Sequence, residues 1–291
     1  MSETLKSLYE SGVKSLESDN GWNDRMTARL DALLLLLHCT EKTKEQFYAY
    51  PNTIVSNSIA RKYANLLHKR KEGYCTAALT GMKGFYKSTF ITSKHTLTPR
   101  PDSESLVEQA ISHVKNLSSR NNPIRILDLC TGTGCIGISI AKDLDEMERG
   151  YILTLTDISL RALRIAKLNC DRLQVYAEIL QSDLFAKMKG RKFDIITANP
   201  PYIPKSICKS LAMEVQKEPK AALFAKDNGM FLIMKIIRNA RKHMLPSACL
   251  IMEMDPRQTE NAAKYAAECN FMQTETFKDL SGKNRGIKIA I

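Results

Sequence analysis

The sequence lacks the patterns of a zinc-binding or a secreted protein. Its eight cysteines form no C-x-x-C pair and no ligand pattern with histidine, which argues against a zinc site. Several, such as Cys170 and Cys249, lie inside apolar runs, as buried free thiols do in a reducing compartment. Residues 1–5 contain an acidic residue and no long apolar core, which argues against a secretory signal. We therefore expect a soluble intracellular protein without a bound metal, in the cytoplasm or the mitochondrial matrix.

A long apolar run is also missing. The five leucines at residues 33–37 lie between Asp31 and His38, whereas a membrane-spanning helix needs about 20 apolar residues. We expect this run to form a buried helix, and we expect no membrane partner.

Concentrated charge of one sign is the third missing feature. The formal net charge is +12, which fits a nucleic-acid or ribosome-associated partner. However, residues 1–99 hold 14 Lys and Arg against 9 Asp and Glu, and residues 100–291 hold 29 against 22. Because both parts share the excess and neither shows a basic stripe, the charge supports a nucleic-acid partner only weakly.

The apolar pattern divides the 291 residues into three parts. In residues 1–72, apolar residues recur at three- and four-residue intervals, which predicts amphipathic helices that pack as a small bundle. Asn23 or Asp24 is the expected N-cap of the helix that contains the leucine run. In residues 73–99, glycines separate short alternating segments, which predicts a β-hairpin linker.

Residues 100–291 alternate between strand and helix patterns. Two prolines hold Arg100 in an extended segment, and Asp102 or Ser103 is placed to cap the helix that follows. The predicted strands are residues 124–129, 151–156, 175–180, 193–197, 248–253, 271–277 and 286–291, with helices at 135–141, 160–169, 230–244 and 257–269. This order predicts a doubly wound, Rossmann-like α/β domain, in which ligands bind outside the carboxyl ends of the strands.

A glycine-rich loop follows the first of these strands. Gly132, Gly134 and Gly137 have the spacing of the dinucleotide fingerprint. Asp157, at the end of the next strand, is placed to bind a ribose. This interpretation predicts a nicotinamide cofactor.

The same loop also fits a second pattern, because Asp128-x-Cys130-x-Gly132-x-Gly134 resembles the first motif of S-adenosylmethionine-dependent methyltransferases. A pyrophosphate binds helix N-terminal amides, whereas S-adenosylmethionine carries a cationic amino-acid end that Asp128 can bind directly or through water. Asp157 would bind the ribose in either case. The candidate cofactor-binding residues are Asp128, Cys130, Thr131, Gly132, Thr133, Gly134, Asp157, Asp183, Leu184 and Asn199.

Asn199-Pro200-Pro201-Tyr202 follows the fourth strand. Consecutive prolines end a strand, and a proline extends the residue before it, so Asn199 is held stretched. The Asn199 side-chain oxygen and the Pro200 carbonyl then form a rigid edge of acceptors that suits a planar NH2 group, beside the ring of Tyr202. A plain turn after a strand is the alternative. At the position where a methyl donor's sulfonium would point, the loop favours methyl transfer over nicotinamide chemistry.

Together these motifs resemble the HemK/PrmC family of protein-(glutamine-N5) methyltransferases, from about Asp31 to the end of the chain. The resemblance rests on residues 97–104, 128–136, 182–185 and 198–203, with Asp157, Asn169, Glu214, Glu218, Asp279, Gly282 and Arg285. Departures include Thr98, where the family has isoleucine, and Ala225-Lys226, where it often has two glycines.

The resemblance implies S-adenosylmethionine-dependent methylation of the glutamine amide in the Gly-Gly-Gln loop of a class I translation release factor. It implies a substrate-recognition domain at residues 1–72, a hairpin linker at 73–99 and a methyltransferase domain at 100–291. Asn199, Pro200 and Tyr202 would be catalytic, and Pro201 and Arg100 would join them in binding substrate. The partner would be the release factor, with no nucleic acid required and with room for an activating subunit.

Two other functions stay open at this point. A nucleic-acid methyltransferase would present an adenine or guanine amino group to the same loop, but it needs space and stacking groups for a flipped base. A non-catalytic module would keep the fold only to dock on translation factors, and the intact loop at residues 199–202 argues against it.

Overall fold

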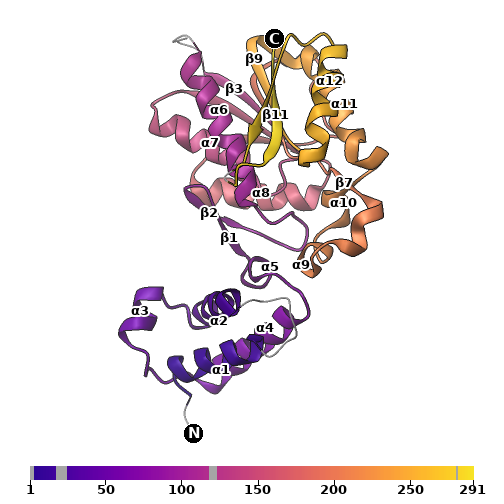
Figure 1. The fold of residues 1–291 in the computed structure, drawn as a ribbon. Coiled ribbons are helices and arrows are strands. Elements are labelled where there is room, and N and C mark those ends of the chain that lie inside the picture. The colour runs from indigo at the N-terminus through magenta and orange to yellow at the C-terminus, as the bar shows by residue number, and fades with distance from the viewer. Residues whose placement is uncertain (1–2, 18–24, 118–122, 280) are drawn as a thin grey trace. The chain divides into compact units, whose positions relative to one another are not determined.

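The computed structural model describes residues 3–17, 25–117, 123–279 and 281–291 (Figure 1). The chain divides into two compact units, Met1–Gly81 with Ala212–Lys217, and Met82–Leu211 with Glu218–Ile291. The division at Gly81 falls inside the segment predicted as a linker. The predicted caps Asn23 and Asp24 lie outside the described residues.

The first unit is the predicted helical bundle. Its described helices are α1 (Leu5–Glu17), α2 (Arg25–Thr40), α3 (Lys44–Ala49), α4 (Asn57–Lys71), α5 (Thr76–Thr80) and α9 (Met213–Gln216). The leucine run forms part of α2, where Leu35 and Leu36 are fully buried. Gly12 allows α1 to approach α4 closely, because a Cβ at this position would collide with the Tyr63 hydroxyl.

A buried ion-pair cluster joins three helices of this unit. Arg70 of α4 is 3% exposed and contacts Asp31 of α2 at 2.6 Å. The same guanidinium pairs with Glu214 of α9, which is a segment that the sequence places far from the bundle. Lys217, just after α9, lies over the ring of Tyr74. These contacts of Glu214 and Lys217 hold residues 212–217 in the helical unit.

The second unit is built on a seven-stranded sheet formed by the described residues, in the order β10-β11-β9-β6-β3-β4-β5. Its strands are β3 (Ile124–Leu129), β4 (Tyr151–Asp157), β5 (Ala177–Gln181), β6 (Phe193–Ala198), β9 (Met244–Glu253), β10 (Gln273–Lys278) and β11 (Asn284–Ala290). Strands β9, β6, β3, β4 and β5 run parallel, whereas β11 runs antiparallel to its two neighbours, β9 and β10. The predicted doubly wound, Rossmann-like sheet is confirmed.

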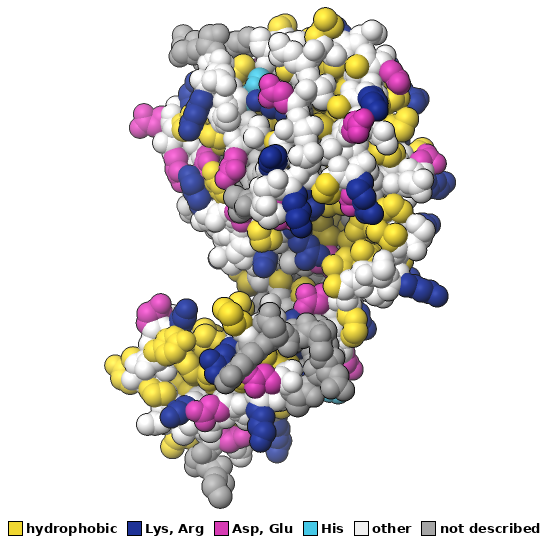
Figure 2. Space-filling model, in the orientation of Figure 1, with side chains coloured by type: hydrophobic (Ala, Val, Ile, Leu, Met, Phe, Trp, Pro, Cys, Tyr) yellow, Lys and Arg dark blue, Asp and Glu magenta, His cyan; other side chains and the backbone are white. Residues whose placement is uncertain are grey.

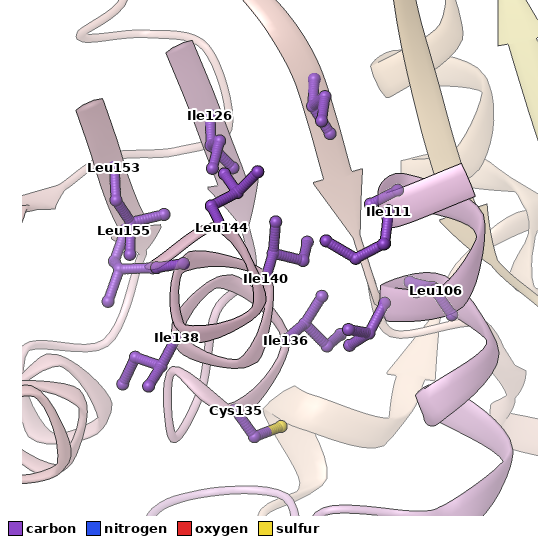
Figure 3. Packing of buried hydrophobic residues seen from close by; sticks show 14 of the residues in the cluster. Leu106, Ile111, Ile126, Cys135, Ile136, Ile138, Ile140, Leu144, Leu153 and Leu155 are labelled. Atoms are coloured by element: carbon purple, nitrogen blue, oxygen red, sulfur yellow. The ribbon is translucent and has the colours of Figure 1, made fainter. Parts of the chain in front are cut away.

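Helices cover both faces of this sheet. One face carries α6 (Glu104–Asn116), α7 (Cys135–Glu146) and α8 (Leu160–Leu173), and the other carries α11 (Met230–Ala240) and α12 (Thr259–Glu268). Figure 3 shows Ile136, Ile138, Ile140 and Leu144 of α7 packing near Ile126 of β3 and Leu153 and Leu155 of β4. Leu127, next to Ile126, belongs to the opposite core, because successive residues of a strand point to opposite faces.

The predicted hairpin is formed by β1 (Met82–Phe85) and β2 (Ser88–Ile91). It belongs to the second unit, where the Tyr86 hydroxyl donates to Asp143 of α7 at 2.9 Å and Lys87 contacts the same carboxylate at 2.6 Å. Part of the segment that the sequence predicted as linker is instead the helix α5. The hairpin is thus anchored to the sheet domain by its own side chains.

The sequence predicted no elements between Tyr202 and Met230, but the structure contains several. They are β7 (Ile203–Pro204), η2 (Lys205–Ser210), α9, α10 (Lys220–Leu223), β8 (Phe224–Ala225) and η3 (Asp227–Gly229). Each is too short to show a periodic pattern. The helix predicted at 230–244 ends at Ala240, and a 3₁₀ turn, η4 (Arg241–His243), leads into β9.

Candidate active site

A cavity of about 470 Å³ lies in the second unit at the carboxyl ends of β3, β4 and β6. The sheet order reverses between β3 and β6, and open α/β sheets bind ligands at such a switch point. Ten predicted site residues line the cavity: Arg100, Cys130, Thr131, Gly132, Thr133, Asp157, Asp183, Leu184, Asn199 and Pro201. The other four, Asp128, Gly134, Pro200 and Tyr202, are described by the structure but are not in its lining.

Asp128 is fully buried beneath the glycine loop. Its carboxylate accepts hydrogen bonds from the hydroxyls of Thr131 at 2.5 Å and Thr197 at 2.7 Å, and from the Gly137 N–H at 3.3 Å. Burial raises the pKa of Asp128 to about 6, although these hydrogen bonds favour the ionised form. Asp128 thus binds the loop itself, and its contact with a ligand, directly or through water, stays a prediction.

Cys130 occupies the first glycine position of the methyltransferase pattern. Its φ of 56° lies in the left-handed region that favours glycine. The methyltransferase pattern therefore has glycine at this position for two reasons, the left-handed backbone conformation and the need for a small side chain. Burial raises the pKa of the Cys130 thiol far above its usual range, so the side chain is a neutral thiol.

Asp157 ends β4 and lines the cavity. Its two carboxylate oxygens accept hydrogen bonds from the Gly132 N–H at 3.0 Å and the Ser159 N–H at 2.9 Å. Burial raises the pKa of Asp157. The carboxylate is thus held rigidly beside the glycine loop, and each oxygen has a further lone pair for a ligand.

Asp183 and Leu184 form another part of the lining, after β5. Asp183 is half exposed and pairs with Lys235 of α11 at 2.9 Å. Leu184 is buried, and its carbonyl accepts a hydrogen bond from the Ser182 hydroxyl at 2.7 Å. This part of the cavity therefore combines a charged rim with an apolar wall.

Asn199 lines the cavity just after β6, and its amide group is held by the protein. Its Nδ2 donates to Glu253 Oε2 at 3.0 Å and to Ser103 Oγ at 3.1 Å. Among the described residues, no hydrogen bond reaches Asn199 Oδ1. The acceptor that the sequence predicted in this loop is therefore available.

Tyr202 follows the two prolines and lies outside the cavity lining. Its hydroxyl donates to Glu253 Oε1 at 2.9 Å and lies 3.1 Å from Nη2 of Arg285. Burial, followed by the charge of Glu253, raises the pKa of Tyr202 well above its usual range. The phenol is thus a hydrogen-bond donor in the layer behind Asn199, and the contact with a substrate side chain stays a prediction.

Arg100 lines the cavity as an ion-paired side chain. Its Nη2 contacts Oε2 of Glu218 at 2.7 Å, and the Glu218 side chain is 7% exposed. Burial raises the pKa of Glu218, and the Arg100 charge opposes this rise. Glu218 follows directly after the segment 212–217 that packs in the helical unit.

Several residues of the site had no role predicted from the sequence. Glu253 is the main one, and its signal was the same as that of Asp157, a polar residue that ends a buried strand. Ser103 was predicted as a helix cap, but it makes no capping hydrogen bond and donates instead to Glu253 at 2.5 Å. The cavity wall at His95 and Thr96 carried no sequence signal.

Within residues 3–17, 25–117, 123–279 and 281–291, no group of three His, Cys, Asp or Glu side chains is placed to hold a metal ion. In those same ranges no helix combines the length and the apolar character that crossing a membrane requires.

Two family models match the chain. Residues 14–81 match the PrmC N-terminal domain, and residues 111–249 match the methyltransferase small domain. These ranges cover much of the helical unit and much of the unit that contains the cavity.

Curated relatives match over nearly the whole chain. The chain is 34% identical over 270 residues to the release factor glutamine methyltransferase of Salmonella typhimurium, covering 92% of this chain and 94% of the relative. It is 34% identical to the Haemophilus influenzae protein of the same name, covering 90% and 91%. With this identity over this length, and with a Rossmann-like sheet that carries the Asn199 loop at its switch point, the chain belongs to the release factor glutamine methyltransferase family.

Proposed function

We propose that this protein transfers a methyl group from S-adenosylmethionine to the side-chain amide nitrogen of the glutamine in the Gly-Gly-Gln motif of a translation release factor. Membership of the family supports this substrate. The observation that supports the chemistry is the orientation of the Asn199 amide in the cavity wall. Its Nδ2 is held by Ser103 and Glu253, and its Oδ1 accepts no hydrogen bond from the described residues.

The cavity fits S-adenosylmethionine in size and in charge. A volume of about 470 Å³ is in the usual range for small-molecule sites. The glycine loop is bonded on one side to Asp128 and on the other to Asp157, and two carboxylates favour a cationic ligand over a pyrophosphate. When bound, this cofactor supplies an electrophilic methyl group on a sulfonium. Asp157 would hold the ribose hydroxyls, and Leu184 would face the adenine.

The loop after β6 would orient the substrate. An amide nitrogen is a weak nucleophile, because its lone pair is delocalised into the carbonyl. Asn199 Oδ1 and the Pro200 carbonyl would accept its two N–H hydrogens. These contacts would fix the nitrogen and stabilise the positive charge that builds there as the N–C bond forms and the S–C bond of the methyl donor breaks, leaving a neutral thioether. The methylated nitrogen then loses one proton to water, which leaves the N-methyl amide.

Positioning supplies most of the rate in this mechanism. Holding the reacting groups in line is worth roughly 7–11 kcal/mol, whereas a general base adds about 100- to 10,000-fold. Glu253 is not the base, because its oxygens already accept from four donors and it does not line the cavity. The two acceptors of the loop are the groups on which the proposal rests.

Arg100 and the helical unit would recognise the protein around the glutamine. Arg100 lines the cavity, and its partner Glu218 continues from a segment that packs in the helical unit. We assign substrate recognition to residues 1–72 and to Arg100, and methyl transfer to residues 100–291. Residues 73–99, which contain α5 and the β-hairpin, would link the two parts.

The nucleic-acid alternative is weaker. The visible face of each unit shows Lys and Arg side chains mixed with Asp and Glu side chains (Figure 2). A protein that binds nucleic acid generally concentrates its basic residues in a patch or stripe.

Labelled S-adenosylmethionine tests the proposal directly. The protein is incubated with release factor, and in parallel with bulk RNA and DNA. We expect label on the glutamine of the Gly-Gly-Gln motif, and none when that glutamine is replaced by alanine. Asn199→Ala is the inactive control, which should still bind the cofactor in calorimetry. Label found only in nucleic acid would overturn the proposed substrate.

A further inference from the structure

Glu253 and Asn199 leave the sheet side by side. Ala198 of β6 is paired with Met252 of the parallel strand β9, so the residue after each of them emerges at the same edge. The Glu253 side chain is 1% exposed. A carboxylate buried to this degree must be compensated by donors.

Four donors compensate it. Oε2 accepts from Ser103 Oγ at 2.5 Å and from Asn199 Nδ2 at 3.0 Å. Oε1 accepts from the Tyr202 hydroxyl and from Arg285 Nη2, both at 2.9 Å. The Arg285 side chain is 15% exposed. Glu253 is thus the shared acceptor of a buried network directly behind the candidate active site.

This network determines which way the Asn199 amide points. A carboxylate only accepts hydrogen bonds, so the NH2 end of the amide must face Glu253 and the oxygen end must face away. We propose that Glu253 is a positioning residue that orients the Asn199 amide so that Oδ1, and not Nδ2, is presented to the substrate nitrogen.

The same contact would strengthen the acceptor. A hydrogen bond from Nδ2 to a charged group polarises the amide and increases the negative charge on Oδ1. The increased negative charge on Oδ1 stabilises the transition state most, because positive charge builds on the substrate nitrogen there. In this respect the inference rests on the proposed function. The effect of Glu253 on methyl transfer should accordingly appear in kcat more than in ground-state binding.

Glu253→Gln tests the inference most directly. It keeps the size of the side chain and replaces one acceptor oxygen with a donor NH2 group. Arg285 can only donate, so the new amide must turn its oxygen toward Arg285 and its NH2 toward Asn199. The Asn199 amide is then expected to flip, which presents Nδ2 to the NH2 of the substrate. Two donors would face each other where an acceptor is needed.

The expected result is a loss in kcat on the order of 100-fold, with the dissociation constant of S-adenosylmethionine unchanged in calorimetry. Glu178→Gln is the matched control. Glu178 pairs with Arg191 and lies outside the cavity lining, so this variant should keep the parent kcat. A Glu253→Gln enzyme with the parent kcat would overturn the inference while the proposed function stood.

Exchanging the two groups separates orientation from general structural support. In Asn199→Asp/Glu253→Gln, the new glutamine amide donates to the new aspartate, whose second oxygen faces the cavity as an acceptor. The double variant should be about tenfold more active than either single variant. A double variant no more active than the weaker single variant would show that Glu253 acts only as structural support.

Side-chain NMR tests the orientation without methyl transfer. The Asn199 NH2 signals are identified by their absence in Asn199→Asp. They should exchange slowly with solvent in the parent and at least about tenfold faster in Glu253→Gln. Unchanged shifts and exchange would overturn the inference even if the release factor proved not to be the substrate. If Glu253→Gln does not fold, Glu253→Asp keeps the charge beside Arg285 but withdraws it from Asn199, and a parent-like kcat in that variant would also overturn it.

Discussion

Asn169 of α8 donates a hydrogen bond from Nδ2 to the carbonyl oxygen of Thr133, at 2.9 Å. The same side chain accepts from the Ile91 N–H at 2.7 Å and donates to the Ile91 carbonyl at 3.0 Å. One fully buried amide therefore connects β2 of the hairpin to the glycine loop. The hairpin and the glycine loop, which were predicted as separate features, are thus both held by Asn169.

We expect Asn169→Ala to lower the free energy of unfolding by about 2–3 kcal/mol, because it leaves buried backbone groups without partners. It should also weaken S-adenosylmethionine binding, since Thr133 belongs to the cavity lining. Urea unfolding and calorimetry measure the two effects. Asn239→Ala, which removes only a hydrogen bond to Lys235 on α11, is the control and should keep the parent dissociation constant.

Asp157→Ala should reduce cofactor affinity more than it reduces stability. The substitution removes the group proposed to hold the ribose and releases the Gly132 N–H. We expect the dissociation constant to rise by about 10- to 100-fold, as for the loss of one or two hydrogen bonds to a charged group. An unchanged constant in calorimetry would remove Asp157 from the site.

Asp128 should make stability depend on pH. Burial raises its folded pKa to about 6, above an unfolded value of about 4. Between these values the folded state binds more protons than the unfolded state, so its contribution to stability falls as pH rises and then levels off. Relative to the parent, Asp128→Asn should gain about 2–3 kcal/mol between pH 4 and pH 7. Urea unfolding at several pH values measures this, and parallel curves for the two proteins would contradict it.

Cys130 should accept glycine more readily than a β-branched residue. At a φ of 56°, glycine relieves strain of about 1–2 kcal/mol but costs about 0.5–1 kcal/mol in chain entropy. Cys130→Gly should therefore unfold within about 1 kcal/mol of the parent, whereas Cys130→Val should be clearly less stable than either protein. Thermal unfolding of the three proteins gives the order, and a valine variant as stable as the glycine variant would argue against the left-handed conformation.

Arg70 should be critical for the helical unit. Removing this buried cation breaks its ion pairs with Asp31 and Glu214, and breaking a buried ion pair costs about 3–5 kcal/mol. We expect Arg70→Met to lower the unfolding temperature strongly and Arg70→Met/Asp31→Leu to recover most of the loss, as followed by calorimetry. Lys167→Met is the control, because Lys167 is 63% exposed in its ion pair with Asp171 and such pairs contribute less than about 1 kcal/mol.

The sequence alone determined the sheet domain and ten of the residues that line its cavity. Asp128, Asp157 and Asn199 each lie at or just after the carboxyl end of an apolar run of strand length, and the carboxyl ends of parallel strands meet at one edge. The glycine spacing located the loop, and the prolines located the acceptor edge. These are local patterns. They can be read from the sequence because a regular helix or strand that is buried on one face has apolar residues at regular intervals.

Only the tertiary structure decided the partners of these residues. Ser103 lies 96 positions from Asn199, and Glu218 lies 118 positions from Arg100. Residues so far apart in the sequence show no periodic pattern that would predict their contact. Glu253 ends an apolar strand as Asp157 does, but its role depends on which donors the core brings against it. Strand and helix patterns record which side chains are buried, whereas the pairing of polar groups follows from how the elements pack, and so the orientation of Asn199 became visible only in the folded chain.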